Sequence, residues 1–162
     1  MDKIEFQKER ENLKNIIEKY EEVMEYYNLR IDAIPRIYMN NPTMIKNSIE
    51  MYSEKIRLME KSVDKPYFAR LDFAGDGETK VEKLYIGKVG VMDEDNNNIT
   101  IDWRAPISSM YYDSNIGRAS YKAPGGIYTG ELLLKRQYDI ENRELKSYQD
   151  VDTVSNDELL KP

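Results

Sequence analysis

The first 65 residues carry apolar side chains at alternating steps of four and three positions. The first stripe consists of Leu13, Ile17, Tyr20, Met24, Tyr27, Ile31 and Ile34. The second stripe consists of Ile45, Ile49, Tyr52, Ile56, Met59 and Val63. Such steps place every member of a stripe on one narrow face of a helix, as in coiled coils. The pattern therefore predicts two helices that each bury one face.

A segment of turn-forming residues, IPRIYMNNPT, separates the two stripes at positions 34–43. Pro35 is expected to disturb the first helix because proline has no backbone N–H. Asn41-Pro42 is typical of a helix start, with asparagine as the cap and proline in the first turn. The chain is therefore expected to reverse here, with the tip at about 35–42.

The two helices are predicted to pair as an antiparallel hairpin, or coiled coil, over residues 1–65. Lys65-Pro66 should end the second helix, since a proline restricts the residue before it. At roughly 1.5 Å per residue, the arm would be about 30–35 Å long. The stripes by themselves also fit a plain two-helix addition to a domain core, and that alternative stays open.

From residue 66 onward the apolar residues follow a period of two, which indicates β-strands. The expected strands cover residues 67–73, 82–92, 98–103, 118–124, 127–140 and 143–150. Short polar and glycine-rich turns separate them and favour antiparallel pairing. One face of the longest strand should carry Tyr128, Leu132, Leu134, Tyr138 and Ile140. The sequence therefore predicts an α+β protein whose second part, residues 66–154, is a small antiparallel β-sheet or half-open barrel.

The last residues carry a pattern that is typical of a helix start. SNDE at 155–158 fits a capping box, and two leucines follow it. Residues 155–162 are therefore expected to begin a helix that continues in a longer protein.

The composition removes several classes of chemistry. The chain of 162 residues has no cysteine and no histidine, so disulfides, thiolate nucleophiles and imidazole bases are excluded. The formal charge of −6 disfavours sequence-independent binding to nucleic acid and favours a protein partner with a basic channel or groove. No stretch reads as a signal peptide or a membrane span. We expect a soluble, cytoplasmic protein.

No stretch of the chain fits a known catalytic or metal-binding template. DEDNNNITIDWR resembles a calcium loop, but Asn98 and Arg104 replace the glycine and glutamate that such a loop needs. GDGETK and GGIYTG lack the spacing of a phosphate-binding loop. A carboxylate nuclease needs Glu-x-Lys, whereas Glu131 and Lys135 would stand about 13 Å apart along a strand. No catalytic residue, cofactor or metal is expected here, and an enzyme such as a nuclease is the least favoured class.

The stretch IDWRAPISSMYYD is interpreted as a structural clamp rather than a direct site, because its serines lack a base to activate them. Trp103 is expected to be a large core anchor at a strand end. Arg104 should pair with Asp102 or Asp113, or stack on a tyrosine ring. The predicted clamp consists of Asp102, Trp103, Arg104, Pro106, Tyr111 and Tyr112.

Apolar residues at the tip of a projecting hairpin indicate a docking surface. The candidates for binding a partner are Ile37, Tyr38, Met39, Asn40 and Asn41. A dimer formed through the helical arm also stays open. The main alternative is an accessory region that binds nucleic acid. That function needs a basic stripe, for which the candidates are Lys122, Lys135 and Arg136.

Several blocks of the sequence occur together in a distinctive order. They read PYFARLDF, LYIGKVGVMDED, IDWRAPISSMYYD, GRASYKAPGGIYTGELLLKRQYDI and SNDELL. In this order they resemble the N-terminal region of HelD, the family of UvrD-like superfamily-1 helicases or ATPases of Gram-positive bacteria that bind RNA polymerase. The resemblance is dense over residues 66–160, and the predicted hairpin lies where that family has its arm.

The resemblance implies a function for the region. In that family the helical arm enters the secondary channel of RNA polymerase, and the β region docks beneath it and joins it to the motor. An ATPase core that uses ATP and Mg follows the DELL residues. ATP hydrolysis releases RNA polymerase from nucleic acid or stalled complexes and so recycles it. This chain would be the non-catalytic region that targets RNA polymerase core, with any contact to nucleic acid made through the full-length protein. The alternative that binds nucleic acid would then be an accessory region of a DNA helicase.

The tip departs from the family pattern in its charge. Arms of this kind often carry acidic residues near the tip, close to the catalytic magnesium of the polymerase. Here the segment AIPRIYMNNPT has no carboxylate, and the nearest one is Asp32. The arm is also short for the family. No active-site role is therefore assigned to the tip.

Overall fold

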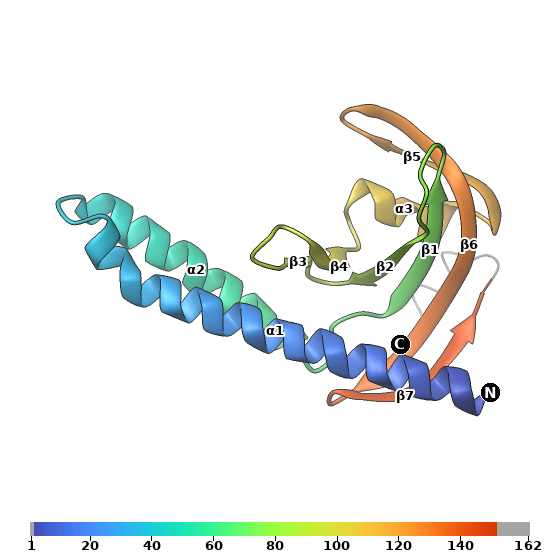
Figure 1. Cartoon of the computed structure of the whole chain (residues 1–162), viewed down its shortest axis with the longest axis horizontal. Helices are drawn as coiled ribbons and strands as arrows, with labels where there is room; N and C mark the ends of the chain where they lie inside the picture. Colours follow the sequence, from blue (N-terminus) through green and yellow to red (C-terminus); the bar gives the residue numbers. More distant parts are fainter. Residues whose placement is uncertain (1, 152–162) are drawn as a thin grey trace.

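The computed structural model describes residues 2–151, which form a helical arm followed by a β-sheet (Figure 1). Helix α1 spans Lys3–Ile37, and helix α2 spans Pro42–Ser62 and ends before the predicted Lys65-Pro66 boundary. The two helices lie side by side and run in opposite directions, as predicted. Every residue of the two predicted stripes is buried or half-buried. The four-three spacing therefore identified the packed faces of the helices.

The tip of the hairpin is tighter than predicted. Helix α1 continues through Pro35, and the Tyr38 N–H still donates to the Ile34 carbonyl at 3.0 Å. Pro35 lies in the last turn, so its missing N–H removes one backbone hydrogen bond just before the helix ends. Asn41 caps α2 as expected, because its side-chain oxygen accepts a hydrogen bond from the Met44 N–H at 3.1 Å.

Seven strands form one sheet beside the base of the arm. They are β1 (Ala69–Gly75), β2 (Glu82–Gly87), β3 (Val91–Met92), β4 (Asn98–Asp102), β5 (Gly117–Ala123), β6 (Gly126–Glu141) and β7 (Glu144–Asp150). Their order is β3-β4-β2-β1-β6-β5, and β7 pairs with the other end of β6. Two short helices, η1 (Pro106–Ser108) and α3 (Ser109–Asp113), connect β4 to β5. The sheet is mostly antiparallel, which confirms the α+β class. The helix expected at residues 155–162 lies outside the described residues.

One strand pair departs from the antiparallel prediction. Strands β2 and β4 run parallel, with Gly87 opposite Asp102. The predicted strand 82–92 is interrupted after Gly87, and β3 is a separate short strand on the far edge of β4. A Cβ on Gly87 would lie 2.2 Å from the Pro66 carbonyl oxygen. Only glycine allows the chain to pass this close to the end of the arm.

A β-bulge divides the predicted apolar face of β6. Leu134 pairs with Asp72 and Leu132 pairs with Phe73, so Leu133 is an extra residue in β6. An extra residue reverses the alternation of side chains beyond it. Leu132 therefore joins one hydrophobic cluster of the protein, and Tyr138 joins the other.

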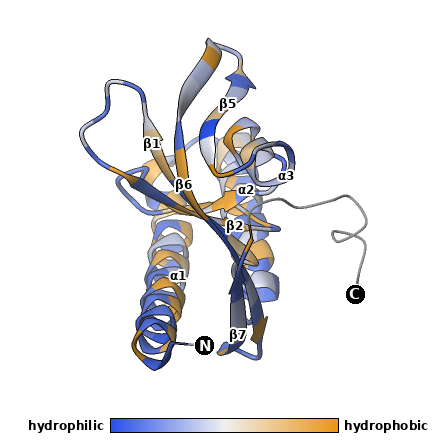
Figure 2. Cartoon of the chain, turned by 90° about the vertical axis from the view of Figure 1, so that its right-hand side faces the viewer, coloured by the Kyte–Doolittle hydropathy of each residue, from blue (hydrophilic) through white to orange (hydrophobic). Residues whose placement is uncertain are grey.

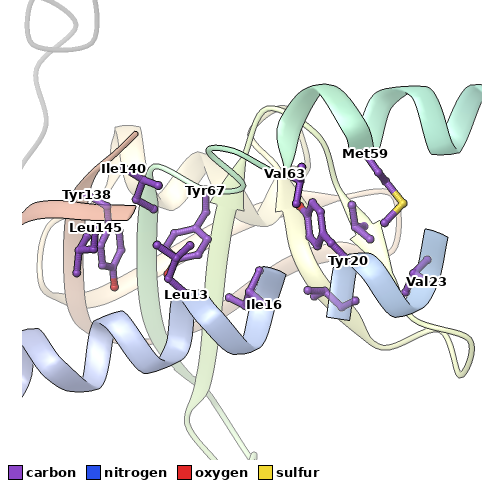
Figure 3. Packing of buried hydrophobic residues seen from close by; sticks show 12 residues of the cluster. Leu13, Ile16, Tyr20, Val23, Met59, Val63, Tyr67, Tyr138, Ile140 and Leu145 are labelled. Carbon is purple, nitrogen blue, oxygen red and sulfur yellow. The ribbon is translucent and has the colours of Figure 1, made fainter. Parts of the chain in front are cut away.

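Two hydrophobic clusters stabilise the fold. The arm-side cluster (Figure 3) contains Leu13, Ile16, Tyr20, Val23, Met59, Val63, Tyr67, Val91, Ile99, Tyr138, Ile140 and Leu145. The second cluster contains Ala69, Leu71, Phe73, Leu84, Ile86, Ile101, Met110, Tyr111, Ala119 and Leu132. Figure 2 shows hydrophobic residues gathered in the middle of the sheet, while much of the outer surface of α1 is hydrophilic. Ile16 and Val23 lie outside the predicted stripe because α1 packs against the sheet as well as against α2.

Candidate functional site

Glu9, in the first turns of α1, is completely buried between the arm and the sheet. Its carboxylate accepts hydrogen bonds from the guanidinium groups of Arg70 at 3.3 Å and Arg136 at 3.2 Å, and from the Tyr138 hydroxyl. Arg70 belongs to β1, and the other two residues belong to β6. Burial and the adjacent Glu9 carboxylate hold the pKa of Tyr138 well above its ordinary value, so the hydroxyl stays protonated and donates. One buried carboxylate thus joins the helix to two neighbouring strands.

Further carboxylates neutralise the two buried arginines. Arg70 donates to Asp72 at 2.8 Å and 2.9 Å. Arg136 donates to Asp150 at 2.6 Å and to Glu5 at 2.9 Å, and this ion pair lowers the pKa of the Glu5 carboxyl. Removing one partner from a buried ion pair leaves a charge without compensation and costs about 3–5 kcal/mol. The arm is therefore fixed on the sheet by groups that cannot be separated without a large loss of stability.

A second set of ion pairs holds the arm where it leaves the sheet. Arg143 donates to Glu21 at 3.1 Å and to Asp64 at 3.0 Å, so the β6–β7 turn contacts α1 and the end of α2. Farther out, the two helices pack on each other, as where the ring centroids of Tyr27 and Tyr52 lie 5.3 Å apart. The hairpin projects well beyond the sheet in Figure 1. Its base is fixed, and its tip is available to a partner.

The five predicted partner-binding residues lie together at this tip. Ile37 and Met39 have 48% and 67% of their surface exposed, whereas Tyr38 is half-buried. Asn40 is exposed and has a φ of 119°, which few residues other than glycine adopt. Asn41 is exposed but its side chain is occupied as the cap of α2. The accessible apolar surface of the tip therefore comes from Ile37 and Met39.

Apart from Ile4 at the start of α1, three more exposed apolar side chains lie along the arm, and the sequence analysis missed them. Leu29 is 61% exposed, Met44 is 42% exposed and Met51 is 46% exposed. Met44 and Met51 stand seven residues apart, which places them on one side of α2. This seven-residue spacing was the available signal, although both residues lie outside the two apolar stripes. Methionine side chains adapt to irregular partner surfaces.

The predicted clamp contains a short-range ion pair and a buried serine. Arg104 donates to the Asp102 carboxylate at 3.0 Å and 2.8 Å, and this pairing lowers the pKa of Asp102. Pro106 begins the short helix η1, so the strand does end here. The hydroxyl of Ser108 is used to donate to the Asp102 carbonyl at 2.9 Å. These contacts close a turn, and the Ser108 hydroxyl takes part in closing it.

The aromatic residues of the clamp run from the surface into the core. Trp103 is 45% exposed, so its prediction as a core anchor was wrong. It lies just after β4, in the turn, where its ring meets Tyr112 edge-on at 6.4 Å. Tyr112 in turn contacts Tyr111 at 5.2 Å, and Tyr111 is the ring that is buried. The anchor of this stretch is therefore Tyr111.

The three candidates for nucleic-acid binding do not form a basic stripe. Lys135 is 1% exposed, and its ammonium donates to the Ser114 carbonyl. Arg136 is 6% exposed and belongs to the Glu9 cluster. Adjacent residues of a strand point to opposite faces of the sheet, so Lys135 is buried on one face and Arg136 on the other. Of the three, Lys122 alone is exposed.

Within residues 2–151, no group of three or more Asp, Glu, His or Cys side chains is placed to hold a metal ion. The described helices also include none that is both long enough and apolar enough to cross a membrane.

Comparison with known proteins gives one finding. The chain matches the family model described as DNA helicase IV HelD, N-terminal domain, over residues 6–159. No curated protein matches the chain. The matched range covers the arm from its first turns onward and the whole described sheet.

Proposed function

The chain belongs to the family of HelD N-terminal domains, and from this we propose that it is the RNA polymerase-binding region of a HelD-like ATP-dependent helicase. In this proposal the arm enters the secondary channel of RNA polymerase core, and the sheet is the seat from which the arm projects. The motor that uses ATP and Mg lies elsewhere in the full-length protein, which works in the cytoplasm. Its ATP hydrolysis releases the polymerase and so recycles it.

The observation that supports this most is an arm with a fixed base and an exposed, apolar tip that has no carboxylate. The buried Glu9 cluster holds the base. Two packed helices form a narrow rod, since each is about 10–12 Å wide with its side chains. Residues 37–45 include no charged side chain, and Arg36 and Lys46 flank them, so desolvating residues 37–45 themselves buries no charge. The net charge of −6 also suits a partner with basic walls.

The tip is proposed to bind without taking part in polymerase chemistry. Holding a catalytic magnesium ion requires oxygen ligands, usually carboxylates. The carboxylate nearest to the tip in sequence is Asp32, which belongs to α1 and lies more than one helical turn before its end. The arm therefore acts as a probe and anchor in this proposal.

The test is the affinity of the 162-residue chain for the host's RNA polymerase core. Ile37→Ser with Met39→Ser removes the exposed apolar surface of the tip. We expect the dissociation constant to rise by about tenfold or more, as for the central residues of an interface. The matched control is Ile4→Ser with Leu133→Ser, which changes two side chains that are 71% and 53% exposed away from the tip. Circular dichroism checks that all three proteins are folded.

The control should bind like the unchanged protein. Equal losses in both double variants would contradict a specific role of the tip. No measurable binding by the unchanged chain would contradict the proposed function itself.

A further inference from the structure

A pocket of about 280 Å³ lies at the end of the sheet that is remote from the Glu9 cluster. It is bounded by the β1–β2 loop and the β5–β6 hairpin, which stand near each other at the top of Figures 1 and 2. Its lining includes the rings of Phe73, Tyr121 and Tyr128, and also Ile107 of η1. This volume suits one long side chain better than a larger ligand.

Three aromatic rings that contact one another line the pocket. Tyr121 and Tyr128 are cross-strand neighbours whose rings stack at 5.3 Å with an interplanar angle of 19°. Phe73 meets Tyr121 edge-on at 6.2 Å. A Cβ on Gly125 would lie 2.5 Å from the Tyr128 hydroxyl oxygen, so the ring folds back over a position that has no side chain. Aromatic faces attract cations, most strongly where water is partly excluded.

The side chains that line the pocket carry a net negative charge. Its lining includes Asp76, Glu78 and Glu82 and no Lys or Arg. Among the described residues, neither Glu78 nor Glu82 has an ion-pair partner. Glu82 is the cross-strand neighbour of Phe73, so its charge lies beside the aromatic wall. Burial and this carboxylate raise the pKa of Tyr121. Two carboxylates therefore remain available to a cation in the pocket.

The two segments that frame the pocket are held together before any ligand arrives. Arg118 of β5 donates to both oxygens of Asp76, at 2.7 Å and 2.8 Å. The Thr129 hydroxyl donates to Asp76 at 2.7 Å, and the Asp76 N–H donates to the Thr129 carbonyl at 3.0 Å. Asp76 is thus used to join the loop to the hairpin. A pocket that is already formed loses less conformational entropy when it binds.

We propose that this pocket binds a lysine or arginine side chain from a segment of a partner protein. The aromatic wall and the two unpaired carboxylates are complementary to an ammonium or guanidinium group on an apolar stem. Nucleic acid does not fit, because its phosphates would approach the carboxylates. An apolar side chain would desolvate those carboxylates without compensation. The site lies outside the arm, and its function does not depend on the proposed role of the tip.

The test uses the full 162-residue chain and a blocked Gly-Arg-Gly tripeptide, followed by two-dimensional amide NMR. The comparison peptide carries citrulline, which has nearly the shape of arginine without the charge. We expect saturable shifts at Gly126, Thr129 and Glu78 with the arginine peptide, and roughly tenfold weaker binding with citrulline. The tip variant Ile37→Ser with Met39→Ser should bind the peptide normally.

Two further variants separate the pocket from general acidity. Glu78→Gln with Glu82→Gln should abolish saturable binding, and Tyr128→Leu should weaken it while both charges remain. Glu94→Gln with Glu141→Gln removes the same charge from exposed positions elsewhere and should have no effect. Equal binding of the two peptides, an equal loss in both glutamine pairs, or an absence of saturable binding would each overturn the proposal.

Discussion

Tyr20 combines a buried ring with a hydrogen-bonded hydroxyl group. It belongs to the apolar stripe of α1, is completely buried and contacts the arm-side cluster. Its hydroxyl lies 2.7 Å from the Thr100 hydroxyl of β4, and Thr100 also donates to the Val89 carbonyl at 3.1 Å. Burial raises the pKa of Tyr20 to about 12. Ionisation of this phenol at alkaline pH therefore lowers the stability of the folded protein.

Tyr20→Phe should lower the free energy of unfolding at pH 8 by about 1 kcal/mol, the usual value of one hydrogen bond. The pH dependence has a definite sign, because the pKa is about 12 in the folded protein and near 10 when the chain is unfolded. Folding favours the protonated phenol, so this stabilisation is complete below pH 10 and is lost as the pH rises toward 12. Urea unfolding at pH 8 and pH 11 measures it. A decline with pH that is as steep in the variant as in the unchanged protein would contradict this assignment.

Single residues were predictable where their role is local. Asn41 was identified as a helix cap because capping involves residues two or three positions away. Glu9 was missed because its partners Arg70 and Arg136 follow it by 61 and 127 residues. A charged residue on an amphipathic helix is usually exposed, and only the tertiary fold makes this one buried. Trp103 was misplaced for the related reason that burial depends on where β4 ends.

Strand β6 depends on a close approach at one glycine. Gly130 pairs with Gly75 of β1, and a Cβ on Gly130 would lie 2.3 Å from the Ala74 carbonyl oxygen. Backbone atoms cannot yield to such a contact without separating the strands. A Cβ on Gly75 would instead meet the side chain of Glu78 at 3.2 Å. Gly75 should therefore accept an added side chain more easily than Gly130.

Gly130→Ala should lower the free energy of unfolding by about 1–3 kcal/mol, as expected when atoms are forced into a packed region. Gly75→Ala is the matched control and should change it by less than about 0.5 kcal/mol, since an exposed glutamate can move aside. Urea denaturation followed by circular dichroism compares the two. Similar values for both variants would show that the close contact to Ala74 does not limit this position.

At the level of elements, the helices were easier to predict than the sheet. The four-three spacing follows from contacts between α1 and α2, which are neighbours along the chain. The apolar face of β6 was predicted as continuous, but the extra residue Leu133 is fixed by pairing with β1. The break after Gly87 likewise arises from contact with Pro66, at the end of the arm. Such contacts between distant segments cannot be predicted from the local spacing of apolar and polar residues.

The whole molecule combines a fixed base with a long reach. If the proposed function is correct, the distance from the sheet to the tip is part of the binding site. Removing residues 25–31 from α1 and 48–54 from α2 takes one seven-residue repeat from each helix. The remaining apolar positions keep their four-three spacing, and the arm becomes about 10 Å shorter.

The shortened protein should unfold in one transition and keep its tip sequence, yet bind RNA polymerase core at least about tenfold more weakly. Affinity for polymerase and thermal unfolding are the two measurements. The Gly-Arg-Gly peptide should bind as before, because the aromatic pocket is unchanged. Unaltered affinity for the polymerase would mean that reach is unimportant and that the sheet makes the main contact.

For the whole molecule, the arm, its tip and the sheet region could be predicted from the sequence, but not how they are arranged in space. The tip residues were recognisable because an apolar turn between two amphipathic helices has no other neighbours to cover it. The pocket beside Tyr121 and Tyr128 was not recognised, because its wall comes from β1, η1, β5 and β6. Strand order, which brings these elements together, depends on contacts distant in sequence.

The Glu9 cluster also determines when the arm becomes fixed. Contacts within the α1–α2 hairpin close short loops and form quickly, whereas Arg136 reaches Glu9 across 127 residues. During synthesis the hairpin is complete well before β6 emerges from the ribosome. Until then Glu9 lacks two of its three partners from the sheet, Arg136 and Tyr138. We therefore expect the Glu9 cluster to be completed late in folding, once β6 has formed.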